Sequence, residues 1–132
     1  MSMKVGVAIP TNMLEDIEDL MRTLGYKSRS KLIQDAVRHY ITFTAWRKGS
    51  GSVVGALAVL YDHEVKGADE QLTDIQHDFL NVIISALHAH LTKNYCLQLI
   101  LVRGDVSDIK ELYLKLNSVK GVIQVTPIIM KV

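Results

Sequence analysis

Two histidines and the single cysteine of this 132-residue sequence stand at a spacing that suits metal binding. His88 and His90 flank Ala89 in a segment with strand character, so both imidazoles are expected to leave the same face of the strand. Cys96 follows six residues after His90, and His77, on a preceding helical segment, is the candidate fourth donor. Three imidazoles and a thiolate suit late first-row transition metals, whereas magnesium and calcium prefer oxygen ligands. The sequence therefore predicts a transition-metal site.

The face on which the thiol lies depends on the turn between two expected strands. A three-residue loop, 93–95, would place His90 opposite Gln98 and Thr92 opposite Cys96, with all three donors on one face. An even-numbered loop without a bulge would place the thiol on the other face. Polar groups left unpaired on an apolar face are costly, so we favour a metal site over purely structural roles. Tetrahedral ligation would indicate Zn(II) and square-planar ligation Ni(II) or Cu(II), and the residues alone leave this open.

Residues 53–132 have the apolar patterning of a small α+β domain that would position these donors. Alternation and apolar runs predict strands at 53–61, 82–92, 96–103 and 122–131. Helical spacing predicts one helix at 68–80, which carries His77, and another at about 107–119. The resulting βαββαβ order is typical of a ferredoxin-like fold.

Residues 1–47 are predicted to form a separate unit with one strand and two helices. Lys4 to Ile9 alternates like a half-buried strand, and apolar stripes indicate helices at about 11–24 and 29–46. A lone strand is unstable, so we predict an obligate dimer in which two copies pair as a two-stranded ribbon over four helices. Such a ribbon fits the major groove of double-stranded DNA, which is the expected partner. Its outward residues would be Lys4, Gly6 and Ala8.

The charge distribution also favours a polyanion partner for the first half. Residues 1–52 carry eight Lys and Arg against five Asp and Glu, whereas residues 53–132 carry seven against nine. Glycine and serine dominate residues 48–52, which predicts a flexible linker between the two domains. Lys27, Arg29 and Ser30 lie at the expected start of a helix, where free backbone N–H groups favour phosphate. A merely solvated first turn is the alternative at this position.

Several classes of protein conflict with the composition. The longest apolar run, Val53 to Tyr61, is too short to cross a bilayer, and the start lacks a secretory pattern, so we expect a cytoplasmic protein with no membrane partner. One cysteine cannot form an intramolecular disulfide. We expect no enzyme, because a planar four-donor site offers substrate no open position and no general base is apparent nearby.

Short motifs spread over nearly the whole chain point to one family. The specific ones are Gln76-His77, Leu87-His88-Ala89-His90 and Cys96-Leu97. Weaker ones are Thr11-Asn12-Met13-Leu14-Glu15 after the first strand, Gly25-Tyr26 with Arg29-Ser30, and Arg103-Gly104-Asp105. Together they resemble the nickel-responsive ribbon-helix-helix transcription regulators of the NikR family.

The resemblance implies an assembly and a ligand geometry. It implies a ribbon-helix-helix domain at 1–47 and an ACT-like domain at 53–132, assembled as a homotetramer with a core of four ACT-like domains. Ni(II) would occupy a square-planar site at the core interface and bias the DNA-binding dimers toward an operator, in the role of a repressor. By this resemblance the metal ligands are His88, His90 and Cys96 of one subunit and His77 of a neighbour.

Two departures from the family's pattern concern DNA contacts. Family members present an arginine and a threonine from the ribbon where this chain has Gly6 and Ala8, which leaves Lys4 as the one long polar side chain there. The family also has a basic pair in the loop before the first helix of the second domain. Only Lys66 remains of that pair, and we expect it to contact DNA in the metal-bound state.

Two further positions bear on metal ions. A hard-cation site of the family uses an acid where this chain has Lys31, although Asp35 is kept, and we hypothesise that the Lys31 ammonium replaces that cation. His63 and Glu64 could form an auxiliary metal site, but we favour a solvated loop.

Two rival functions share the same features. One is a regulator of the same architecture whose core senses another metal, an amino acid or another small molecule, with structural histidines. The other is a metal-storage or metal-chaperone protein whose basic half serves only in dimerisation.

Overall fold

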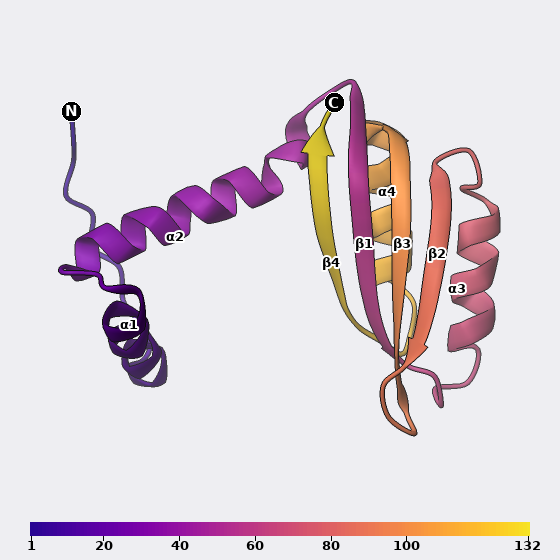
Figure 1. Ribbon diagram of the computed structural model, residues 1–132, viewed down its shortest axis with the longest axis horizontal. Helices are drawn as coiled ribbons and strands as arrows, with labels where there is room; N and C mark the ends of the chain where they lie inside the picture. Colours follow the sequence, from indigo (N-terminus) through magenta and orange to yellow (C-terminus); the bar gives the residue numbers. More distant parts are fainter. The chain divides into compact units, whose positions relative to one another are not determined.

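The computed structural model describes all 132 residues and divides the chain into two compact units, Met1–Thr42 and Phe43–Val132. The first unit contains α1 (Thr11–Leu24) and most of α2 (Arg29–Thr44). The second contains a short 3-10 helix and a four-stranded sheet with two helices (Figure 1).

Local chemistry sets the ends of the helices in the first unit. Gly25 ends α1 with a left-handed φ of 75°, a conformation that glycine adopts without a steric penalty. At the start of α2, the Ser28 hydroxyl accepts a hydrogen bond from the Lys31 backbone N–H at 3.2 Å. Ile17 and Leu32 are the buried residues of the two helices.

The strand expected at 4–9 is not formed. Residues 1–10 belong to neither a helix nor a strand. A single chain provides no partner for this segment, and an unpaired strand leaves its backbone hydrogen bonds unmade. Val5 and Val7, on the face expected to be covered, are 77% and 73% exposed. The segment thus has apolar side chains that nothing within its own chain covers.

The second unit has the predicted βαββαβ order. Its elements are η1 (Ala45–Lys48), β1 (Ser52–Asp62), α3 (Ala68–His77), β2 (Ile83–His90), β3 (Tyr95–Asp105), α4 (Val106–Asn117) and β4 (Val122–Lys131). The strands are antiparallel in the order β2-β3-β1-β4. Side chains of both helices and of the inner sheet face form one core, with Leu57, Leu72, Ile100, Ile109 and Leu112 fully buried. The predicted α+β fold is confirmed.

The hairpin between β2 and β3 has a different register from the one expected. His90 pairs with Cys96 and His88 with Gln98, whereas the expected loop paired Thr92 with Cys96. Thr92 belongs to the turn because its hydroxyl accepts hydrogen bonds from the backbone N–H groups of Asn94 and Tyr95, at 3.3 and 3.0 Å. The shift is an even number of residues, so the same side chains still share a face.

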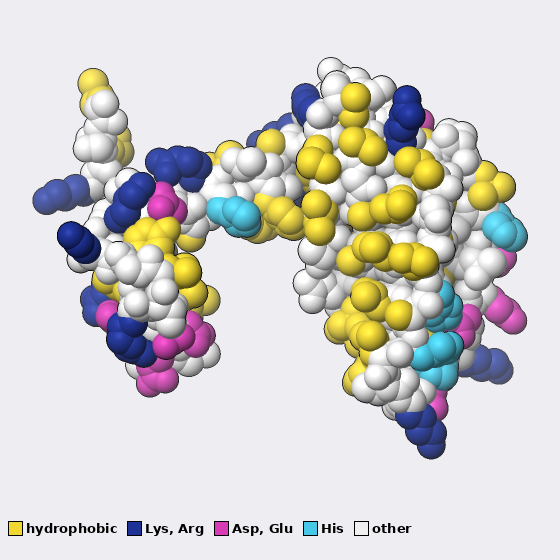
Figure 2. Space-filling model, in the orientation of Figure 1, with side chains coloured by type: hydrophobic (Ala, Val, Ile, Leu, Met, Phe, Trp, Pro, Cys, Tyr) yellow, Lys and Arg dark blue, Asp and Glu magenta, His cyan; other side chains and the backbone are white.

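The opposite face of the sheet is apolar and exposed. By the strand register, Leu101, Ile128 and Met130 point away from the helices, and they are 41%, 56% and 59% exposed. Figure 2 shows rows of hydrophobic side chains over this face. We call it the outer sheet face. A sheet normally buries such a surface against a second layer.

Candidate metal centre

The β2–β3 hairpin brings a thiol and two imidazoles together. The Cys96 Sγ atom lies 3.3 Å from Nδ1 of His90, its directly paired neighbour on β2. His88 lies two residues earlier on the same face, and its ring centroid is 4.9 Å from that of His90. These three predicted ligands therefore share one face of the hairpin, but the close group of ligand atoms takes in His90 and Cys96 and not His88.

Cys96 is a buried thiol beside two imidazoles. The side chain has no exposed surface and is a free cysteine. Burial raises the pKa of its thiol, and the nearby Asp69 carboxylate raises it further. A thiol and imidazole nitrogens are donors that late transition metals prefer, so the residues present fit nickel, copper or zinc.

A buried hydrogen-bond network orients His88. The Tyr61 hydroxyl donates to Asp69 Oδ1 at 2.7 Å and lies 3.2 Å from His88 Nε2. Because Tyr61 has given its one proton to the carboxylate, His88 must donate through Nε2, which leaves the Nδ1 lone pair free. Burial and Asp69 together place the pKa of Tyr61 well above its usual range, so the hydroxyl stays protonated.

Two glutamines extend this network from β3 to α3. Gln98 Nε2 donates to the Tyr61 hydroxyl at 3.3 Å, and Gln76 Nε2 donates to Gln98 Oε1 at 2.7 Å. Sequence reasoning gave Tyr61 and Gln98 no role. The sequence does contain one indication of this network. Gln98 is a polar residue at an inward position of an otherwise apolar strand.

The fourth predicted ligand, His77, lies outside the close group of donor atoms, and so does His88. His77 is the last residue of α3 and is exposed. The group of His and Cys donors that lie within 4.8 Å of one another contains His63, His90 and Cys96. Glu64 is exposed and is not in that group, so His63 is grouped with the hairpin donors and not with its neighbour.

The residues predicted to contact DNA are all on the surface. Those in the first unit are Lys4, Gly6, Ala8, Lys27, Arg29 and Ser30, and all six are exposed. Arg29 pairs with Glu18 through its Nε at 2.7 Å, and the Ser30 hydroxyl accepts a hydrogen bond from Gln34. Lys66 is exposed in the segment between β1 and α3 of the second unit.

Asp35 gathers three partners on the first unit. Lys31 Nζ lies 2.9 Å and Arg38 Nη1 3.0 Å from Asp35 Oδ1, and the Tyr26 hydroxyl donates to Oδ2 at 2.7 Å. The hydrogen bonds from Lys31 and Tyr26 lower the pKa of the Asp35 carboxyl. An ammonium group therefore stands directly against this carboxylate, where the family resemblance implies a cation.

The sequence has relatives over almost its full length. Residues 54–130 match the family described as the NikR C terminal nickel binding domain. A proposed nickel-responsive regulator of Methanococcus vannielii is 41% identical over 96% of this chain and 91% of its own. Another, of Dictyoglomus thermophilum, is 43% identical over 90% of this chain and 88% of its own. The chain belongs to the NikR family.

The second unit of this NikR-family chain is similar in fold to solved structures of other proteins. An uncharacterized protein from Thermotoga maritima has a TM-score of 0.56 at 20% identity, and it covers 61% of this chain and 100% of its own. The ACT domain of a GTP pyrophosphokinase from Chlorobium tepidum has a TM-score of 0.50 at 17% identity, over 59% of this chain and all of its own. The second unit is therefore ACT-like. None of the helices has the length and apolar character needed to span a bilayer.

Proposed function

We propose that this NikR-family chain is a nickel-responsive transcriptional repressor. Ni(II) binding to the second unit would be coupled to the binding of double-stranded DNA by dimers of the first. The observation that carries this proposal is the placement of His88, His90 and Cys96 on one hairpin face, inside the segment that matches a nickel-binding domain.

The metal ligands proposed are His88, His90 and Cys96 of one subunit and His77 of a neighbouring copy. His77 is exposed at the end of its helix and lies outside the donor group of its own chain, which leaves it accessible to another subunit. A bound metal ion would supply a cross-link between subunits that fixes the end of α3. Cu(II) and Zn(II) are the competing ions for such a donor set.

Two apolar surfaces support a homotetramer as the working assembly. The exposed Val5 and Val7 need a cover, which antiparallel pairing with the same segment of a second chain provides, so we propose a ribbon-helix-helix dimer. The outer sheet face is a second surface that a further copy would bury. Together the two contacts give a dimer of dimers.

The DNA-binding residues are proposed to divide between positioning and base readout. The ribbon residues Lys4, Gly6 and Ala8 would face the major groove. Lys27, Arg29 and Ser30 would hold phosphates at the start of α2, and Lys66 would add a contact from the second unit. Metal-dependent regulation needs a coupling of about 1–3 kcal/mol between the two binding events.

A metal titration followed by a DNA mobility shift tests this function. Wild-type protein should develop nickel–thiolate absorption and should then retain a subset of genomic DNA fragments. His88→Ala and Cys96→Ala should lose both properties, because each removes one ligand. Lys110→Ala, on the exposed side of α4, is the control and should behave as wild type.

A negative result in each of the two measurements would contradict a different part of the proposal. Variants that keep the nickel response would show that the assigned ligands are wrong. Wild-type protein that binds nickel but retains DNA equally with and without it would exclude a nickel-responsive regulator.

A further inference from the structure

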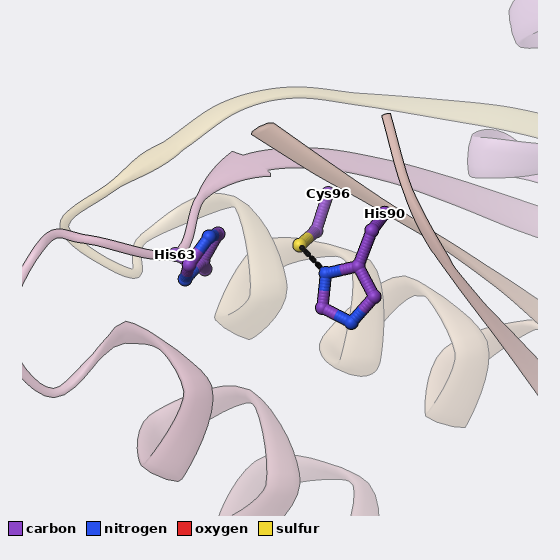
Figure 3. A group of neighbouring side chains, drawn as sticks. All are labelled: His63, His90 and Cys96. Carbon is purple, nitrogen blue, oxygen red and sulfur yellow. Dashed lines mark hydrogen bonds between the residues drawn. The ribbon is translucent and has the colours of Figure 1, made fainter. Parts of the chain in front are cut away.

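Three donors of a single subunit lie close enough to hold a metal ion without a second chain. The ligand atoms of His63, His90 and Cys96 all lie within 4.8 Å of one another. Figure 3 shows the sulfur of Cys96 between the two rings, close to the ring of His90. The His63 and His90 ring centroids are 6.0 Å apart with the planes at 83°. Two imidazoles and one thiol therefore face a common point.

The orientation of His63 is fixed by the hairpin turn. Its backbone N–H donates to the Asn94 carbonyl at 2.8 Å, and its ring Nε2 is hydrogen-bonded to the Lys93 carbonyl. A carbonyl oxygen only accepts, so Nε2 carries the proton and Nδ1 keeps its lone pair. Metal-ligating histidines typically donate their other ring N–H to a carbonyl or carboxylate in this way. His63 is thus held in the tautomer that a ligand needs.

We propose that His63, His90 and Cys96 form a tetrahedral Zn(II) site within one subunit, with water as the fourth ligand. Zinc bonds of about 2.0 Å to nitrogen and 2.3 Å to sulfur give a tetrahedron with edges of roughly 3.3–3.5 Å. The 3.3 Å between Cys96 Sγ and His90 Nδ1 already matches such an edge. The separations in the group reach at most 4.8 Å, so the donors must approach by up to about 1.5 Å, which side-chain rotation can provide.

This site and the proposed nickel site exclude each other. Both use His90 and Cys96, so one ion at a time can be held by each hairpin. An ion bound through His63 leaves His88 on Tyr61 and makes no use of His77 from a neighbour. It would therefore not cross-link subunits. The inference deepens the proposed function, on which it rests only through these shared ligands, by giving a geometric means of separating zinc from nickel.

The test titrates full-length protein with ZnCl2 and, separately, with NiCl2 against a chromophoric chelator. The variant is His63→Gln, whose amide N–H can still donate to the Lys93 carbonyl and keep the turn. We expect zinc affinity to fall at least about 10-fold, in the range that metal sites lose with even an outer-shell partner. Nickel affinity and the nickel–thiolate absorption should be unchanged.

His77→Ala is the matched variant in the opposite sense. It should keep the zinc affinity and lose tight nickel binding, because its histidine belongs only to the proposed nickel set. Unchanged zinc affinity in His63→Gln overturns the zinc site, whatever nickel does. Unchanged nickel affinity in His77→Ala contradicts the four-donor nickel set and leaves the zinc result standing, so the two failures are distinguishable.

X-ray absorption of zinc-loaded wild-type protein decides the matter without any variant. Two imidazoles, one sulfur and one water oxygen around zinc support the proposed site. Three imidazoles with one sulfur place zinc in the nickel set and overturn it. Tetrahedral Co(II) bands that are present in wild type and weakened in His63→Gln give the same answer by optical spectroscopy.

Discussion

Tyr61 links a polar network in the core to the imidazole of His88. It has no exposed surface, and its hydroxyl is shared among Asp69, His88 and Gln98. A ring held in one orientation with a defined tautomer binds a metal ion with less entropy lost than a free ring. The position of this hydroxyl therefore bears on metal affinity although no atom of Tyr61 is a proposed ligand.

Replacement of Tyr61 by phenylalanine removes the hydroxyl and keeps the buried ring. We expect Tyr61→Phe to lower nickel affinity by about 10–100-fold, the usual loss when an outer-shell partner of a ligating histidine is removed. The nickel–thiolate absorption at saturation should persist, because all four proposed ligands remain. Competition with a chelator measures the affinity. Tyr113→Phe, whose ring packs edge-on against Trp46 in the same unit, is the control. Equal nickel affinities in the two variants would exclude an orienting role for Tyr61.

Helix α2 carries a cluster of ionic contacts around Asp35. Lys31 and Arg38, one turn before and one after Asp35, both contact its carboxylate. These pairs are exposed and contribute little to stability. Their consequence is chemical, because a carboxylate already neutralised by an ammonium group has little attraction for potassium.

DNA binding is accordingly expected to be independent of potassium. Mobility shifts with nickel-loaded protein in KCl and in NaCl at equal ionic strength should give the same affinity. Lys31→Glu, which restores an acid beside Asp35, should bind DNA more tightly in KCl than in NaCl. Lys27→Glu, a lysine close by in sequence, should weaken binding equally in both salts. A requirement of the wild-type protein for potassium would contradict the replacement of the cation by Lys31.

Periodicity predicted the elements of the second unit well, because each of its strands and helices buries one face in a single core. The strand expected at 122–131 and the structure's Val122–Lys131 coincide. The predicted hairpin register was wrong. The actual register is set by hydrogen bonds to the Thr92 hydroxyl, which an apolar pattern does not reveal. The sequence likewise favours a solvated loop at His63, because the apolar pattern carries no information about its neighbours in space. Its proximity to Cys96 arises from the pairing of β1 with β3, a long-range contact without a local signal.

For the whole molecule, the outer sheet face is the exposed apolar surface on which the proposed tetramer depends. Leu101 lies on β3, one of the two central strands, and is paired with Ala56 of β1 and Ser85 of β2. Its neighbours on this face include the exposed Ile128 and Met130. A second copy packed here would remove these side chains from water.

Leu101→Asp places a charge on this surface and should reduce the proposed tetramer to dimers. A carboxylate without a partner in a dry interface is destabilising by about 3–5 kcal/mol. In the free second unit Leu101 is 41% exposed, so the charge can be solvated and the fold retained. Sedimentation velocity measures the assembly, and the nickel–thiolate absorption should be lost along with it, because no neighbour supplies His77. Leu114→Asp, at an exposed leucine of α4, is the matched control and should remain tetrameric with its nickel absorption intact. Dimers of Leu101→Asp that still bind nickel tightly would mean that the fourth ligand comes from the same subunit or from the ribbon-linked partner.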